Sequence, residues 1–193
     1  MSYKFEHLTP QTWNDFAALF GERGACGGCW CMVWRMSNAE FQKNKGEGNR
    51  KAMQRLVKKE LPIGLIMYKD VIPVGWCAFA PREEYIRLAA SRIFKPVDEK
   101  PVWSISCFFI HKDYRKQGLS EKLIRQVIVS AKKMGVQILE AYPSDPYDAG
   151  VPAPFVWTGL TSAFVKAGFK EVARRSKTRP IMRYVVKTTD SNK

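Results

Sequence analysis

Hydrophobic and polar positions along the chain repeat with two different periods, and together these predict a mixed fold. Short apolar runs rich in β-branched and aromatic residues predict strands, whereas apolar positions three or four residues apart predict helices. The expected strands are 3–8, 65–68, 74–80, 102–110, 137–142, 169–174 and 181–186. The expected helices are 9–20, 49–60, 120–134 and 161–167. Because helices and strands are interleaved, the chain is expected to be an α/β (α+β) protein.

Three segments fall outside these patterns. Residues 21–48 are irregular and rich in Gly and Cys, 82–100 form a charged helical or looping insertion, and 142–159 form a Pro-rich loop too long for a plain connector. With no internal repeat and no linker, we predict one domain over 1–193 that ends in a short disordered tail. No run approaches the roughly 18 apolar residues of a membrane span, and the N-terminus lacks a signal peptide's apolar core. We therefore expect a cytoplasmic protein without membrane contact.

The segment between the strand 102–110 and the helix 120–134 predicts an anion site. It reads Ile110-His-Lys-Asp-Tyr-Arg-Lys-Gln-Gly-Leu-Ser120 and leads a strand into a helix N-terminus. Backbone N–H groups there lack helical partners, and the helix dipole adds partial positive charge. Gly118 has no Cβ, so the backbone can approach a phosphate closely. The alternative is a plain turn with basic residues on its surface.

The net charge also points to a polyanionic partner without identifying it. Lys and Arg number 32 against 18 for Asp and Glu, which gives +14. Such a balance fits a phosphorylated cofactor, an acidic substrate or nucleic acid, or simply a solvated basic surface. The basic residues are scattered and form no recognised nucleic-acid motif, so nucleic acid is the less favoured partner.

Five cysteines raise the question of metal or redox chemistry. Cys26, Cys29 and Cys31 form a C-x-x-C-x-C segment, while Cys77 and Cys107 lie in separate predicted strands. An odd number argues against complete disulfide pairing, and a structural zinc site usually has four ligands. We therefore predict reduced, packed thiols and no metal.

Two motifs together resemble the GNAT superfamily of acyl-CoA-dependent N-acetyltransferases. The family loop has the pattern Gln/Arg-x-x-Gly-x-Gly/Ala, and here Arg115-Lys-Gln-Gly-Leu-Ser120 places Ser120 in the last position. Phe164-Val-Lys-Ala-Gly-Phe169 resembles the short helix and Gly-Phe that enter the sixth strand of the family. The Cys-rich N-terminal segment resembles that of a bacterial subgroup. The resemblance implies a mostly antiparallel sheet, splayed between strands four and five and flanked by helices.

The resemblance further implies acetyl-CoA, or another acyl-CoA, as the acyl donor. Its pyrophosphate would lie on the amides of 116–120, and its pantetheine arm would pair with the fourth strand. A backbone N–H near Phe108 would then polarise the thioester carbonyl. The implied cofactor-binding residues are Phe108, Phe109, Ile110, Arg115, Lys116, Gln117, Gly118, Leu119 and Ser120.

The acid and base of the reaction are less evident, because the chain departs from the family pattern. Ser104 and Phe164 stand where many members carry a Glu base and a Tyr acid. Glu140 and Tyr142 share one face of the predicted strand 137–142, so they become the candidate base and acid. The alternative is that Glu140 pairs with a basic residue and that Tyr142 belongs to the core.

The acceptor is expected to be a small-molecule or peptide amine of unspecified identity. In the family, the region after the first helix helps to wall the acceptor site, which makes Trp30, Trp34 and Arg35 candidate contacts, with core packing as the alternative. The predicted reaction is direct attack of the amine on the thioester. A CoA-binding regulatory or inactive relative and a basic nucleic-acid-binding protein stay open as alternatives, and a homodimer is considered because dimers are common in the family.

Overall fold

The computed structural model describes residues 2–59, 61–146 and 156–187. Its strands are β1 (Tyr3–His7), β2 (Gly64–Lys69), β3 (Ile72–Pro81), β4 (Trp103–Ile110), β5 (Ile138–Ala141), β6 (Lys170–Arg174) and β7 (Pro180–Val185). Its helices are α1 (Trp13–Phe20), α2 (Asn38–Lys43), α3 (Glu47–Val57), α4 (Ile86–Ala89), α5 (Leu119–Lys133) and α6 (Thr161–Lys166). Every predicted strand and helix is therefore present, with its ends moved by a few residues. The predicted C-terminal tail lies mostly outside the described residues.

The strands form one sheet in the order β1-β2-β3-β4-β5-β7-β6. All neighbours are antiparallel except β4 and β5, which run parallel. The pairing of β4 with β5 ends at Ile105 and Ala141, whereas β4 stays paired with β3 as far as Ile110. The mostly antiparallel sheet with a splay between the fourth and fifth strands is thus confirmed.

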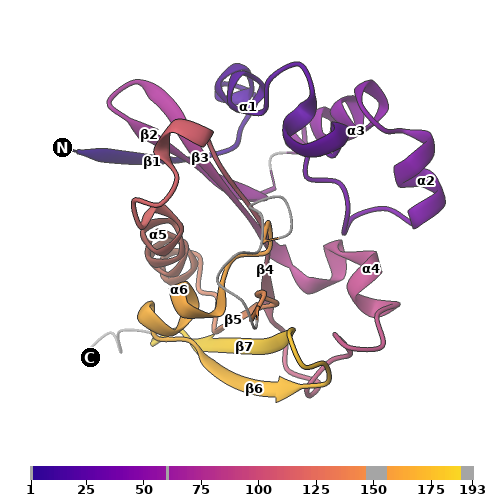
Figure 1. Cartoon of the computed structure of the whole chain (residues 1–193), viewed down its shortest axis with the longest axis vertical. Helices are drawn as coiled ribbons and strands as arrows, with labels where there is room; N and C mark the ends of the chain where they lie inside the picture. Colours follow the sequence, from indigo (N-terminus) through magenta and orange to yellow (C-terminus); the bar gives the residue numbers. More distant parts are fainter. Residues whose placement is uncertain (1, 60, 147–155, 188–193) are drawn as a thin grey trace.

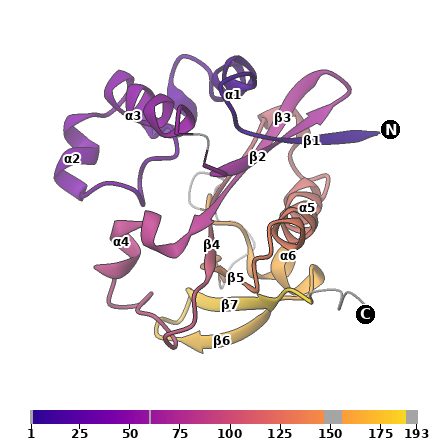
Figure 2. The same cartoon turned by 180° about the vertical axis from the view of Figure 1, so that it is seen from behind.

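Helices cover both faces of the sheet (Figures 1 and 2). α1, α2 and α3 lie on one side, and α5 and α6 lie on the other. The faces follow from the alternation along each strand: Trp76 packs under the N-terminal helices, whereas its neighbour Cys77 packs under α5. α5 buries Leu123, Ile124 and other apolar residues at helical spacing. Two apolar clusters therefore share one sheet.

The segment 21–48, expected to be irregular, contains more structure than predicted. It includes a tight turn at Gly24–Gly28, whose backbone angles at 25–27 are not helical, and the helix α2. The Ser37 hydroxyl accepts a hydrogen bond from the Glu40 amide, and the Glu40 carboxylate accepts one from the Ser37 amide. This capping box is visible in the sequence as Ser-x-x-Glu, a helix-start signal that the hydrophobic pattern alone does not contain. Within 82–100 the helical option is also realised, as α4.

A bulge at Ser106 interrupts the alternation along β4. Ile105 pairs with Phe79 and Cys107 pairs with Ala78, so Ser106 is an extra residue opposite β3. As a result, Ile105 and Phe108 both pack on the α5 side, whereas Cys107 lies on the side of the N-terminal helices. The bulge therefore decides which β4 side chains face each half of the molecule.

None of the helices in the described part of the chain is long and apolar enough to cross a lipid bilayer.

Candidate active site

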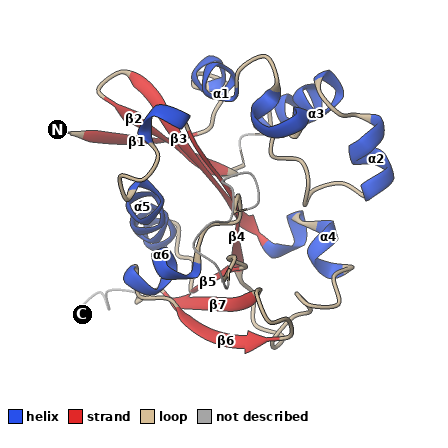
Figure 3. Ribbon diagram, viewed as in Figure 1, coloured by secondary structure: helices blue, strands red, loops and turns tan. Residues whose placement is uncertain are grey.

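The loop from β4 to α5 presents a row of backbone amides with no internal partner. A single helical turn (Lys112–Tyr114) precedes it (Figure 3), and the backbone is left-handed at Lys116 and Gly118, with φ of 60° and 71°. Gly118 is the N-cap residue of α5. Among the described residues, the amides of 116–120 donate no hydrogen bond. These amides lie at the N-terminus of α5, which is the positive end of the helix dipole, as an anion site needs.

Space and side chains around this loop agree with such a site. A Cβ built on Gly118 would meet no atom within 4 Å, so open room lies in front of the amides. Arg115 donates from Nε to the Ile110 carbonyl at 3.1 Å, and Gln117 donates from Nε2 to the Asp113 carbonyl at 3.4 Å. Both side chains therefore brace the loop. The Lys116 side chain is exposed.

The splay between β4 and β5 exposes the Phe108 amide, which donates to the Trp157 carbonyl at 2.6 Å. Gly159 lets the chain approach this closely: its φ is 84°, and a Cβ there would lie 2.9 Å from Phe164 and 3.1 Å from Phe108. The Phe108 N–H thus points into the opening between the strands and already meets a carbonyl oxygen, the kind of acceptor that a thioester would offer.

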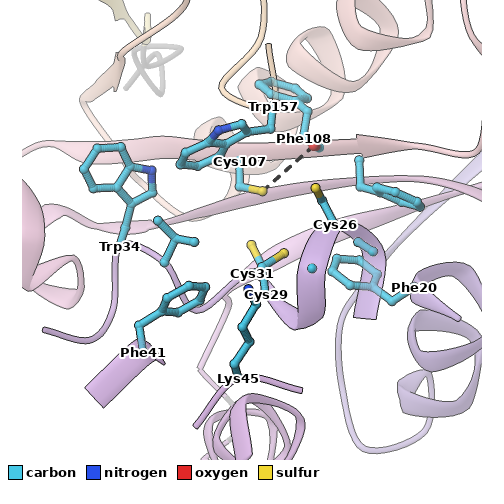
Figure 4. A pocket seen from close by; sticks show the side chains of 14 residues that line it. Phe20, Cys26, Cys29, Cys31, Trp34, Phe41, Lys45, Cys107, Phe108 and Trp157 are labelled. Carbon is cyan, nitrogen blue, oxygen red and sulfur yellow. Dashed lines mark hydrogen bonds between the residues drawn. The ribbon is translucent and has the colours of Figure 1, made fainter. Parts of the chain in front are cut away.

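A cavity of about 310 Å³ lies beside Phe108 on the side of the N-terminal helices (Figure 4). Its aromatic walls are Phe20, Trp34, Phe41 and Trp157, which come from four separate parts of the chain. The described lining residues are Phe20, Ala25, Cys26, Gly27, Cys29, Cys31, Val33, Trp34, Phe41, Lys45, Cys107, Phe108, Phe109 and Trp157. Because a deep apolar cavity with few polar groups is typical of small-molecule sites, it is the candidate acceptor pocket.

Of the three residues predicted to contact the acceptor, only Trp34 lines this cavity. Trp30 is 3% exposed and stacks on Trp13 and Phe20 in the core, so core packing, the alternative left open by the sequence, describes it. Arg35 forms an ion pair with Glu84 at 3.1 Å and does not line the cavity either. Neither side chain therefore lines the cavity, because the aromatic rings of α1 hold Trp30 in the core and the Glu84 carboxylate holds Arg35.

Four thiols meet at the cavity, which the sequence did not indicate. Cys26, Cys29 and Cys31 from the N-terminal loop and Cys107 from β4 are all free and line it (Figure 4). No group of three or more metal-ligating side chains within the described residues could hold a metal ion. The bulge in β4 brings Cys107 to this face. Strict alternation along the strand would instead place Cys107 on the same face as Ile105.

The thiols of Cys31 and Cys107 differ in acidity because of their hydrogen bonds. A hydrogen bond with the Cys107 thiol holds the pKa of Cys31 below its ordinary value. The Trp76 indole Nε1 donates to the Cys31 Sγ at 3.3 Å and acts in the same direction. The same thiol contact and burial raise the pKa of Cys107 well above the usual range. Cys31 is thus the thiol most prone to ionise in this pair.

Glu140 and Tyr142 lie in a buried polar cluster at the other end of β4, and neither lines the cavity. The fully buried Glu140 carboxylate pairs with Arg82 at 2.8 Å and with Arg183 at 2.7 Å. The Tyr142 hydroxyl donates to Glu140 at 2.6 Å and lies 2.8 Å from the Ser104 hydroxyl. Burial, and next the charge of Glu140, raise the pKa of Tyr142 well above its ordinary value. The roles of Glu140 as base and Tyr142 as acid stay predictions. Their surroundings resemble the alternative, in which Glu140 pairs with a basic residue and Tyr142 belongs to the core.

Known proteins resemble this chain both in sequence pattern and in fold. Residues 30–150 match the model of the acetyltransferase (GNAT) family. None of the curated proteins compared with the chain matches it. Because the family model covers more than half of the chain, it carries the assignment.

Solved structures of GNAT proteins share the fold at low identity. A GNAT-family acetyltransferase from Listeria monocytogenes has a TM-score of 0.60 at 9% identity, covering 95% of this chain and 94% of that chain. PaiA N-acetyltransferase from Thermoplasma acidophilum, solved with coenzyme A, has a TM-score of 0.54 at 14% identity, with coverages of 96% and 99%. The ribosomal-protein-S18-alanine N-acetyltransferase from Escherichia coli has a TM-score of 0.51 at 16% identity, with coverages of 99% and 98%. The chain therefore belongs to the acetyltransferase (GNAT) family and is an acyl-CoA-dependent acetyltransferase.

Proposed function

We propose that the protein transfers an acetyl group from acetyl-CoA to an amine by direct attack of the amine on the thioester. The observation that carries this proposal is that two sets of backbone hydrogen-bond donors lie on one strand and on the loop that follows it. The amides of 116–120, at the N-terminus of α5, have no hydrogen-bond partner among the described residues, and the Phe108 amide points into the splay between β4 and β5. The acetyl-CoA molecule would be held at one end by its phosphates and at the other end by its thioester.

The residues divide the work by their chemistry. The amides of 116–120 and the Lys116 ammonium would bind the pyrophosphate, while the backbone of 108–110 would pair with the pantetheine arm. The Phe108 N–H would donate to the thioester oxygen as negative charge develops there. For this, the Trp157 carbonyl, which now accepts that hydrogen bond, has to withdraw. The cavity beside Phe108 would hold the acceptor so that its nitrogen faces the acyl carbon.

Binding of acetyl-CoA to a pair of glycine variants tests the donor site. Gly118 and Gly135 lie at opposite ends of α5, both have φ of 71°, and a Cβ at either would meet no atom within 4 Å. Gly118→Trp should fill the space in front of the amides and lower the affinity about 100-fold, since several charge-assisted hydrogen bonds are lost. Gly135→Trp imposes similar backbone strain and should bind normally.

Isothermal titration calorimetry measures both affinities, and circular dichroism confirms that each variant is folded. Absence of acetyl-CoA binding by the unmodified protein would reject the proposed donor. Equal affinities for the two folded variants would reject the placement of the phosphates on the 116–120 loop. Binding without thiol release across a broad amine panel would favour the regulatory alternative.

A further inference from the structure

The walls of the cavity beside Phe108 are suited to an apolar body rather than a hydrated one. Phe20 and Phe41 come from helices α1 and α2, while the rings of Trp34 and Trp157 lie 5.7 Å apart and form a further part of the wall (Figure 4). A volume of about 310 Å³ has room for a six-membered ring or a short alkyl chain, together with the group that carries it. Ligands entering such a cavity lose their water, and this favours apolar surface.

The charge of the cavity is positive. Lys45 is the only charged side chain among its described lining residues, and it extends toward Cys29 and Cys31 (Figure 4). Among the described residues Lys45 forms no ion pair, so no neighbouring carboxylate offsets its charge there. The whole chain carries +14. A second cationic group on an acceptor would therefore be desolvated and also repelled.

We propose that the acceptor is a monoamine carried on an aromatic or alkyl group, and not a polyamine or another polycation. This rests on the proposed function, because it assigns the cavity to the acceptor of that reaction. The nitrogen reaches the Phe108 end of the cavity as the free amine, and the apolar body lies among Trp34, Phe41 and Trp157. The distal part of the molecule passes close to Lys45, where a further ammonium group is disfavoured.

Two amines of equal length test this assignment directly. Hexylamine and 1,6-diaminohexane differ only in the second ammonium group. We expect hexylamine to have a kcat/KM about tenfold higher or more with acetyl-CoA, measured by release of the CoA thiol. Calorimetric titration of both amines into the protein with CoA present gives the same comparison without turnover. Phenethylamine is expected to behave like hexylamine.

A charge reversal separates repulsion from the effect of apolar burial. Lys45→Glu should reduce or invert the preference for hexylamine, because the added carboxylate attracts the distal ammonium group. Lys43→Glu is the matched control: Lys43 is also exposed and nearby in the chain, but does not line the cavity. It should leave the ratio between the two amines unchanged.

The outcomes distinguish this inference from the proposed function. If 1,6-diaminohexane binds or reacts as well as hexylamine, or if neither amine binds, the assignment is overturned even where acetyl-CoA binds and other amines are acetylated. If hexylamine binds selectively but acetyl-CoA does not bind, the cavity is confirmed as an apolar amine site and the proposed function fails. An unchanged amine ratio in Lys45→Glu would overturn the electrostatic part of the argument.

Discussion

The two halves of β4 have opposite surroundings, although only the bulge at Ser106 separates them. Before the bulge, Ser104 contacts the cluster around Glu140, where every charge has a partner. After the bulge, Cys107 faces and Phe108 borders a cavity with apolar walls, free thiols and Lys45, which forms no ion pair within the described part of the chain. The comparison teaches that charged residues on a strand beside a cleft can be fully engaged with one another rather than directed into the cleft. Here the matched polar groups form a rigid cluster, and the space for a ligand opens where polar pairing stops.

The largest effect is expected from removing the carboxylate at the centre of the cluster. Glu140→Ala leaves Arg82 and Arg183 without their shared buried partner, which should lower the free energy of unfolding by about 3–5 kcal/mol. Urea denaturation measures this. The matched control is Glu171→Ala, which removes an exposed carboxylate paired with Arg174 and should cost under about 1 kcal/mol.

Glu140→Gln then tests the catalytic prediction on the same residue. If Glu140 only holds the arginines, turnover per folded molecule should stay within a few-fold of the unmodified protein at every pH. A loss of about 100-fold in kcat with unchanged acetyl-CoA affinity would instead establish Glu140 as the base and break the contrast between the two halves of β4.

A smaller loss is expected from the tyrosine of the same cluster. Tyr142→Phe removes the hydroxyl that donates to Glu140, contacts Ser104 and accepts from Arg82, so three polar groups lose a partner. The expected decrease in unfolding free energy is about 1–3 kcal/mol. If Tyr142 is the general acid, kcat should fall in the Tyr142→Phe variant even though the variant is fully folded at the assay temperature.

The smallest effect concerns the pH dependence of thiol alkylation at the cavity. Only the thiolate reacts, and the pKa of Cys31 is lowered, so its alkylation rate should reach its plateau at a lower pH than that of an ordinary thiol. Burial raises the pKa of Cys77, which lies under α5, and this thiol should stay unreactive over the same range. Iodoacetamide labelling with peptide mass spectrometry measures both. Equal pH profiles for the two thiols would contradict the assigned hydrogen bonds of Cys31.

Trp76→Phe sharpens the same measurement. It removes the indole N–H that donates to the Cys31 Sγ and keeps an aromatic ring in the core. The plateau of Cys31 alkylation should then move to higher pH. A profile that does not move would leave the Cys107 thiol and the positive charge of Arg35 as the sources of the lowered pKa of Cys31.

Local patterns predicted much of the fold. The strand 102–110, the loop that ends at Gly118 and the helix that follows were all placed from periodicity and glycine position, and the unpartnered amides of 116–120 lie where the anion site was expected. These features depend on residues close together in the chain. The helix α2 was missed because its signal is the Ser37 and Glu40 capping box, and not an apolar stripe.

Site residues that depend on distant partners were predicted less well. Trp30 and Arg35 were candidates by position in the chain, but the aromatic cluster of α1 and the carboxylate of Glu84 hold them away from the cavity. Glu140 on β5 pairs with Arg82, which directly follows β3, and with Arg183 on β7. No spacing in the sequence encodes these pairs.

The sequence by itself determined the order of helices and strands, the loop that leads into the N-terminus of α5 and the family resemblance, because hydrophobic period and glycine position act over a few neighbouring residues. Only the tertiary structure decided which residues line the cavity. The bulge at Ser106 turned Cys107 toward the thiols of the N-terminal loop, and the splay of β4 from β5 exposed the Phe108 amide. The bulge and the splay both depend on pairing between strands that are distant in the chain. A single extra residue in one strand reverses the faces of all the side chains that follow it.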